Sequence, residues 1–136
     1  RVNKTLGPAA LRRRLEHIRA FEQLLSDEGT TLIKCFLHIS HAEQGRRLRE
    51  RLQDPTKQWK FDYSDVRQRA QWHAYRRAYE TALAATSTPA APWYVIPADH
   101  KWVRDLVVTA VLVRTLRGLR MRYPPPPANL DQVRLD

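Results

Sequence analysis

Residues 30–40, TTLIKCFLHIS, decide the fold class. The stretch is rich in β-branched and aromatic residues, and its apolar residues recur at every second position from 33 to 39. This period places them on one face of an extended chain, so the stretch is predicted to be a well-covered strand. A second apolar run, WYVIP at 93–97, is predicted to be a short buried strand.

Helical patterns lie before, between and after the two strands. In the first of them, apolar residues recur at steps of three and four, which predicts a helix with one buried stripe. Pro8 suits its start and Gly29 its end. Ser40 and Glu43 have the spacing of a capping box, which predicts the start of the next helix. The helices are predicted at 9–27, 41–53, 64–85 and 101–121.

This order of elements is typical of an α/β protein with a parallel sheet and right-handed crossovers. Only two strands are predicted, whereas strands covered on both faces usually belong to a larger sheet. We therefore expect part of the sheet to be missing from this chain. An exposed apolar sheet edge should then drive association, and we expect a homo-oligomer. Because the sequence opens on Arg1 rather than methionine, we also expect it to be a piece of a longer chain.

The composition favours an anionic partner. The 136 residues fit one domain. Lys and Arg number 24 against 14 Asp and Glu, a net charge of +10 that suits nucleic acid, an acidic membrane or a phosphate-rich ligand. No segment has the roughly 18 uninterrupted apolar residues of a membrane span. Cys35, the single cysteine, is predicted to be a buried, unreactive thiol. We expect a reduced, cytoplasmic compartment and no membrane partner.

Three stretches resemble the C-terminal half of the family-2 polyphosphate kinases. They are FEQLLSDEGTTLIKCFLHIS (21–40), RLRERLQDPTKQWKF (47–61) and TSTPAAPWYVIPADHKWVRDLVV (86–108). The resemblance reaches Tyr123, so we assign 1–123 to the C-terminal part of such a domain and 124–136 to a Pro-rich extended tail. It implies part of a P-loop kinase-like, three-layer α/β fold, with parallel strands, flanking helices and a helical lid at about 54–85.

The resemblance also implies an activity. Members of the family are phosphotransferases that move a phosphoryl group between inorganic polyphosphate and a nucleotide (AMP, ADP or ATP), with Mg²⁺. Their Walker A and Walker B segments lie upstream of the part matched here. The sequence has no G-x-x-x-x-G-K-[ST] motif, whose backbone amides and lysine cradle phosphates. Its histidines show no metal-ligand spacing. We therefore assign no catalytic residue and no metal ligand, expect the Mg²⁺ ligands upstream, and expect the isolated chain to be inactive.

Basic residues near the lid and near helix starts are the candidate polyphosphate contacts. Arg47 and Arg51 lie four apart on one helix face, and planar guanidinium groups suit a row of phosphates. Lys57 and Lys60 flank Trp59, and flexible ammonium groups on a mobile loop can follow a polymer. The full set is Arg47, Arg51, Lys57, Lys60, Arg69, Lys101 and Arg104. The alternative is a solvated basic surface.

Two aromatic features are predicted to be structural. Trp59 is interpreted as an anchor that packs the loop against the body, because large aromatic side chains usually pack. Trp72, Tyr75, Tyr79 and Leu83 lie at helical spacing and are interpreted as a packing stripe.

Two other functions stay open. A non-catalytic fragment or pseudoenzyme would explain the missing phosphate loop. A nucleic-acid-binding module would explain the charge and the aromatic residues among basic ones, but none of the usual signatures of such modules is present. We rank nucleic acid below polyphosphate as the partner.

Overall fold

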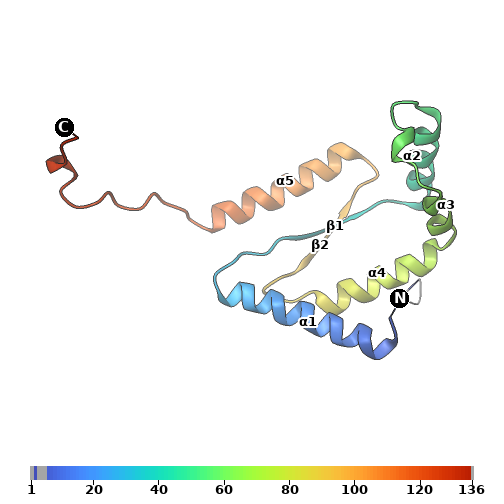
Figure 1. The fold of residues 1–136 in the computed structure, drawn as a ribbon, viewed down its shortest axis with the longest axis horizontal. Helices are drawn as coiled ribbons and strands as arrows, with labels where there is room; N and C mark the ends of the chain where they lie inside the picture. Colours follow the sequence, from blue (N-terminus) through green and yellow to red (C-terminus); the bar gives the residue numbers. More distant parts are fainter. Residues whose placement is uncertain (1, 3–5, 136) are drawn as a thin grey trace.

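The computed structural model describes residues 2 and 6–135, and it confirms the α/β class. Its main elements are α1 (Pro8–Asp27), β1 (Lys34–His38), α2 (His41–Gln53), α3 (Tyr63–Ala70), α4 (Trp72–Thr86), β2 (Trp93–Pro97) and α5 (Lys101–Gly118). Two 3-10 turns, η1 (Gln58–Lys60) and η2 (Leu130–Gln132), lie in the segments predicted to be loop and extended tail. The tail leads away from the body of the molecule (Figure 1).

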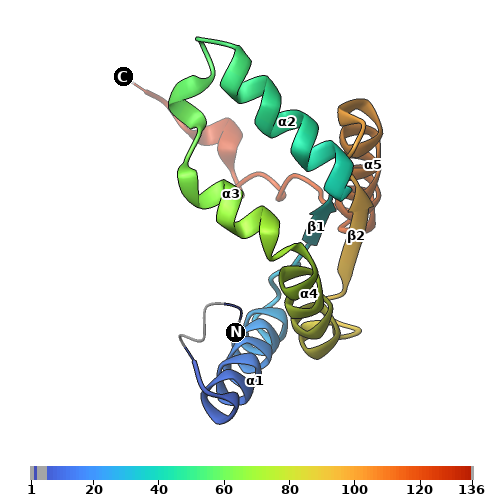
Figure 2. The same cartoon turned by 90° about the vertical axis from the view of Figure 1, so that its right-hand side faces the viewer.

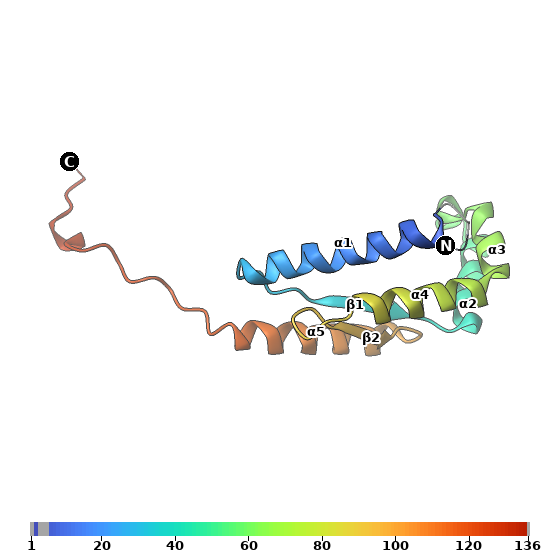
Figure 3. The ribbon, with the colours of Figure 1, turned by 90° about the horizontal axis from the view of Figure 1, so that it is seen from below.

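The two strands are parallel, as predicted, and lie between helices. Lys34 is opposite Trp93, and His38 is opposite Pro97. The crossover between the strands contains α2, α3 and α4. Figure 3 shows α1 and α5 on opposite sides of the strands, which gives three layers. Within the described residues, none of the helices combines the length and apolar character needed to cross a bilayer.

Local side-chain and backbone signals set the predicted helix ends. Gly29 has a φ of 83°, its N–H donates to the carbonyl of Ser26 (3.0 Å), and the next N–H donates to Leu25 (2.9 Å). This is the Schellman arrangement, which glycine favours because it carries no Cβ. At the start of α2, the Ser40 hydroxyl accepts the N–H of Glu43 at 3.1 Å, as the capping spacing predicts.

A partly buried cation holds the layers together. The Nζ of Lys34, on β1, lies 2.7 Å from a carboxylate oxygen of Glu22 on α1 and donates to the carbonyl of Thr86 at 2.6 Å. The same Nζ lies 5.0 Å from the ring of Trp93 on β2, whose indole N–H donates to the Thr86 hydroxyl at 2.9 Å. One ammonium group therefore contacts α1, the end of α4 and β2.

The prediction that both strands are well covered is wrong. Leu37 on β1 is 47% exposed and Val95 on β2 is 60% exposed, while Ile96 is buried. Cys35 is only half-buried. The strand predicted over 30–40 is also shorter than expected. Both differences follow from the two-stranded sheet, because five residues of β2 can pair only five of β1 and further strands are absent from the described residues.

The single helix predicted over 64–85 is two helices. Gln71, with φ −98° and ψ 20°, ends α3 and precedes α4. The break turns α3 away from α4, so that α2, η1 and α3 form an arm beyond the strands (Figure 2). The sequence there has neither Gly nor Pro, which is why the helical period did not reveal the break. The last helix ends at Gly118 rather than at 121.

Candidate functional site

The site is built where the two strands end. Parallel strands end at the same edge, and α2 and α5 begin just beyond β1 and β2. The Asp99 carboxylate accepts the backbone N–H of Ser40 at 2.7 Å, which ties the two helix starts together. That hydrogen bond lowers the pKa of Asp99. Asp99 does not cap α5, whose N-cap residue His100 makes no side-chain capping hydrogen bond.

Arg47 holds the same two elements together. Its Nε donates to Glu43 at 2.7 Å, and its Nη2 donates to the carbonyls of Ala98 (2.7 Å) and Asp99 (3.3 Å). Arg46 and then Arg47 lower the pKa of Glu43 to about 2, so this carboxylate stays charged in the folded protein. Arg47 therefore supports the edge of the sheet as well as contributing positive charge to it.

Lys57 pairs with two carboxylates at the end of α2. Its Nζ lies 2.6 Å from Glu50 and 2.9 Å from Asp54. Lys57 is the main cause of the lowered pKa of Glu50, and the charges of Arg46 and then Lys101 lower it further. Arg46 joins Glu50 (3.3 Å) to Glu43, so one ion-pair network runs along α2.

The arm is held by two of the predicted arginines. Arg51 on α2 lies 3.3 Å from Asp65 on α3. Arg69, at the end of α3, donates to the carbonyl of His41 (2.6 Å) and to the amide oxygen of Gln44 (3.0 Å). Both side chains therefore position the arm.

Gly45 is a contact residue that the sequence analysis missed. It is buried beneath the guanidinium of Arg69, and a Cβ at this position would lie 2.8 Å from Arg69 Nη2. The signal in the sequence was a glycine in the middle of a predicted helix. Glycine is unfavourable there unless a close neighbour leaves no room for a side chain.

Trp59 does not anchor the loop by burial, so that prediction is wrong. The side chain is 78% exposed, although its N–H donates to the carbonyl of Thr56 at 3.0 Å. The Nζ of Lys60 lies over the indole, 5.0 Å from its centre. Arg104 pairs with its neighbour Asp105 at 2.7 Å. Lys60 and Arg104 therefore lie outside the ion-pair network on α2.

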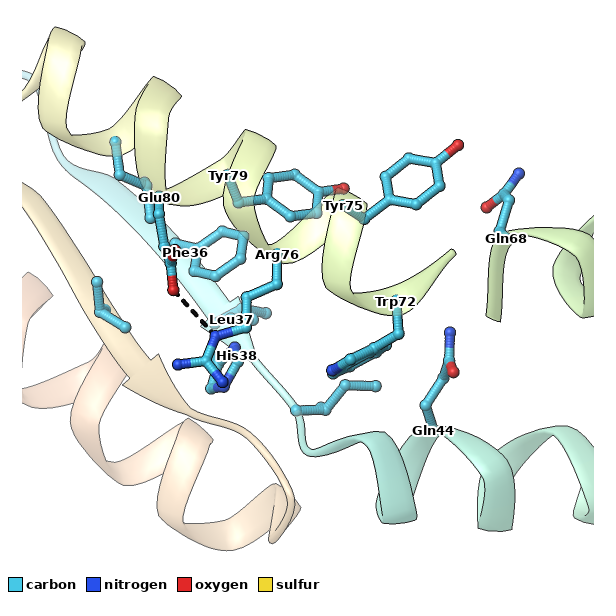
Figure 4. A pocket seen from close by; sticks show the side chains of 13 residues that line it. Phe36, Leu37, His38, Gln44, Gln68, Trp72, Tyr75, Arg76, Tyr79 and Glu80 are labelled. Atoms are coloured by element: carbon cyan, nitrogen blue, oxygen red, sulfur yellow. Dashed lines mark hydrogen bonds and ion pairs between the residues drawn. The ribbon is translucent and has the colours of Figure 1, made fainter. Parts of the chain in front are cut away.

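The aromatic stripe of α4 lines a pocket rather than a closed core. The pocket, of about 440 Å³, lies between β1 and α4 (Figure 4). Phe36 and Tyr79 have ring centres 5.0 Å apart, and Trp72 lies 5.1 Å from the ring of His41. The amides of Gln44 and Gln68 line its end beside the arm. Arg76 and Glu80, 2.9 Å apart, also line the pocket, so aromatic side chains alternate with polar and charged ones.

The described part of the chain brings together no group of three or more His, Cys, Asp or Glu side chains that could hold a metal ion. The chemistry that its residues offer is the binding of anions by Lys and Arg, with helix starts nearby. We therefore assign no metal-dependent step to these residues.

Comparisons with known proteins show the family of the chain. The family model described as Polyphosphate kinase 2 matches residues 1–123. An AMP/ADP-polyphosphate phosphotransferase of Meiothermus ruber is 48% identical over 133 residues, which are 98% of this chain and 50% of the relative. An ADP-polyphosphate phosphotransferase of Rhodopseudomonas palustris is 40% identical over 121 residues, 89% of this chain and 42% of the relative.

A solved structure confirms the fold. The crystal structure of polyphosphate kinase 2 from Arthrobacter aurescens TC1 matches 97% of this chain and 47% of that protein, with a TM-score of 0.92 and 40% identity. The chain therefore spans about half the length of these phosphotransferases.

Proposed function

Because the chain belongs to the polyphosphate kinase 2 family, we propose that it forms the C-terminal half of a phosphotransferase. The enzyme would move a phosphoryl group between inorganic polyphosphate and a nucleoside mono- or diphosphate. The relatives named for AMP, ADP and GDP support a nucleotide as the second substrate. The proposed cellular site is the cytoplasm, and the proposed assembly is a homo-oligomer.

The observation that carries the proposal is the row of cations along α2, which begins at the carboxyl edge of the sheet. Lys57, just beyond the end of α2, lies 2.6 Å from Glu50 and 2.9 Å from Asp54. A polyphosphate presents many anionic oxygens, so it can replace these carboxylates as the partner of Lys57. Arg47 adds a positive charge beside the starts of α2 and α5.

Residues 54–85 are proposed to act as a lid over the phosphates. They include η1, α3 and most of α4, and the hinge would lie at Gln71, where α3 and α4 meet. The proposed polyphosphate contacts within the lid are Lys57, Lys60 and Arg69, and those outside it are Arg47, Arg51, Lys101 and Arg104. Closure would exclude water and strengthen these charge interactions.

The proposed magnesium site lies in the remaining half of the domain. Mg²⁺ prefers carboxylate and phosphate oxygens, and the ion would neutralise charge on the transferring group. In the described residues, Glu43 and Glu50 on α2 are already paired with cations, and Asp99 accepts the N–H of Ser40. This chain is therefore proposed to bind and enclose the substrate while the other half supplies the reacting centre.

The first prediction tests the activity with a chimera. The half of the Meiothermus ruber relative that this chain does not match is joined to residues 1–136. The chimera should form nucleotide from AMP or ADP and polyphosphate in the presence of Mg²⁺. The isolated chain should not, because loss of even one transition-state donor commonly costs about 100-fold and the whole phosphate loop is missing.

The control is the unmatched half alone, which lacks the cations described above. Turnover by the isolated chain would refute the proposed division of the site. An inactive but folded chimera would instead favour a non-catalytic role.

A further inference from the structure

The C-terminal tail, residues 124–136, is a part of the chain that the proposed function does not use. It begins with four consecutive prolines at 124–127. Proline fixes φ at about −65° and has no N–H to donate, so such a run stays extended, at about 3.1 Å per residue. The prolines therefore act as a stiff spacer that carries the end of the tail away from the body, as Figures 1 and 3 show.

Beyond the spacer, the tail forms a small apolar surface. Asn129 has a φ of 60°, a left-handed conformation that asparagine tolerates, and it begins the 3-10 turn η2. The N–H of Val133 donates to the carbonyl of Leu130 at 3.3 Å. Because residues three apart lie on the same side of a 3-10 helix, Leu130 and Val133 share one face. Leu135 follows and is 97% exposed.

This apolar surface has no partner in the described part of the chain. Every residue from 116 to 135 is exposed. No hydrogen bond or ion pair joins the described tail residues, 124–135, to the rest of the described chain. Apolar side chains gain free energy only where they leave water, so the tail is suited to a surface outside its own body.

A second uncovered apolar surface lies on α5. Trp102 and Leu106 are one turn apart and are 69% and 62% exposed. Val113 lies about two turns further along the same face, and Leu112 and Leu116 widen the surface beside it. This surface is left uncovered although α5 packs against β2.

We infer that the tail of one copy of the protein lies on this exposed face of α5 in a second copy. The tail cannot use its own α5, because the prolines that follow the helix keep the chain extended instead of turning it back. The family model ends at residue 123, so the tail lies outside the part of the chain that the kinase domain accounts for. The inference therefore assigns the tail to a second copy and not to the half of the kinase domain that this chain lacks. It rests on one part of the proposed function, the homo-oligomer, and not on the activity.

The dimensions and charges fit this exchange. α5 has 18 residues and is about 27 Å long, whereas 13 extended tail residues reach about 40 Å. If two copies meet at the C-terminal ends of α5, each tail can run along the whole partner helix, and a two-fold axis makes the two contacts identical. The tail has two aspartates and one arginine, while α5 has four basic residues and one acidic residue.

The matches to relatives extend into the tail. The match to the solved Arthrobacter aurescens structure covers 97% of this chain, so it omits about four residues, fewer than the 13 of the tail. The Meiothermus ruber relative matches 98% of the chain. The tail thus has counterparts in relatives although its own body does not support it, and a second copy is the support that fits.

The first test measures the dissociation constant of the dimer by analytical ultracentrifugation, in the chimera described above. The unsubstituted chimera should be a dimer. Leu130→Ser with Val133→Ser should raise the dissociation constant about 100-fold or more, because a two-fold contact then loses four buried apolar side chains. Ala128→Ser with Gln132→Ser is the matched control in the same tail and should change the constant by less than about threefold.

These substitutions lie at exposed tail positions, so the body should fold equally in all three chimeras, which circular dichroism checks. Equal dissociation constants of the two double variants would overturn the inference and assign the homo-oligomer to another surface. A monomeric unsubstituted chimera would overturn both the inference and the proposed homo-oligomer.

Cross-linking gives a second measurement and identifies the copy that the tail contacts. In a chimera without other cysteines, Leu130→Cys is placed on one copy and Leu106→Cys on another. After mixing, a short bismaleimide should link the two copies. Leu130→Cys mixed with Arg19→Cys is the control and should not be linked, because α1 and α5 lie on opposite sides of the strands.

Two cross-linking results would overturn the inference. One is the absence of a link between the two copies. The other is a link that forms within a single chain when Leu130→Cys and Leu106→Cys are combined and the protein is diluted, which would assign the tail to its own α5.

Activity separates this inference from the proposed function. A chimera that dimerises through its tail but transfers no phosphoryl group would support the inference and contradict the proposed function. A chimera that transfers phosphoryl groups and keeps its dimer after Leu130→Ser with Val133→Ser would support the function and overturn the inference.

Discussion

At the scale of single residues, Lys34 links β1 to α1 and to the end of α4. Its side chain is 11% exposed, and that of its partner Glu22 is 13% exposed. An ammonium group so shielded is tolerated only because Glu22, a carbonyl and an indole ring surround it. The alternating pattern of the strand concealed this role, because a lysine within a strand is usually taken to face water.

The second prediction is that Lys34→Met destabilises the fold by about 3 kcal/mol, the lower end for breaking a buried ion pair. The reason is that Glu22 and the Thr86 carbonyl would lose their partner in a shielded place. Urea unfolding followed by circular dichroism measures the change.

The matched control is Arg76→Met, which removes a cation whose ion pair with Glu80 is more than half exposed on both sides. It should leave stability nearly unchanged. Equal effects of the two substitutions would contradict the buried role of Lys34.

At the scale of elements, the arm depends on the fit between α2 and α3. Gly45 leaves the space that Arg69 fills, and Arg69 then reaches the first turn of α2. Arg51 and Asp65 make a second link, at 3.3 Å. Both links join α2 to α3, so they hold the arm in its own shape.

The third prediction concerns this fit. Gly45→Ala should gain up to about 1 kcal/mol in helix propensity but displace Arg69, whose two hydrogen bonds are worth roughly 0.5–1.5 kcal/mol each. In the chimera, the net result should be a small loss of stability. In an Arg69→Ala background, the same substitution should stabilise by about 0.5–1 kcal/mol.

The double-mutant cycle measures the coupling directly. Additive effects of Gly45→Ala and Arg69→Ala on stability would show that the two positions are independent, contrary to the contact described above.

At the scale of the whole molecule, a net charge of +10 attracts any polyanion. Only the placement of the charges can make one surface a specific site. The exposed arginines of α1 are remote in sequence from the arm, and they offer a reference for the effect of charge alone.

The fourth prediction compares two charge reversals of the isolated chain. Lys57→Glu with Lys60→Glu should weaken polyphosphate binding and reduce the slope of log affinity against log salt by roughly 2, one for each lost phosphate contact. Arg12→Glu with Arg19→Glu changes the net charge by the same amount and should have a smaller effect.

Measuring the polyphosphate affinity of both double variants over a series of salt concentrations compares the two effects. Equal losses in the two variants would reduce the proposed site to general charge attraction. Tighter binding of DNA than of polyphosphate by the unsubstituted chain would favour a nucleic-acid-binding function.

The sequence by itself determined the two strands, most of the helices and the order in which they follow one another. The two parallel strands, the ends of the first helix and the cap at Ser40 depend on neighbouring residues, so local patterns reveal them. The resemblance on three motifs led to the family that the comparisons then showed. The break at Gln71 carried no local signal, because neither Gly nor Pro marks it.

Only the tertiary structure decided what each side chain faces. Hydrophobic period separates one face of an element from the other, but it does not say which neighbour covers that face. Trp59 therefore proved exposed, and Lys57 proved paired with carboxylates. The register of β1 and β2 joins residues about 60 positions apart, and no local pattern fixes it.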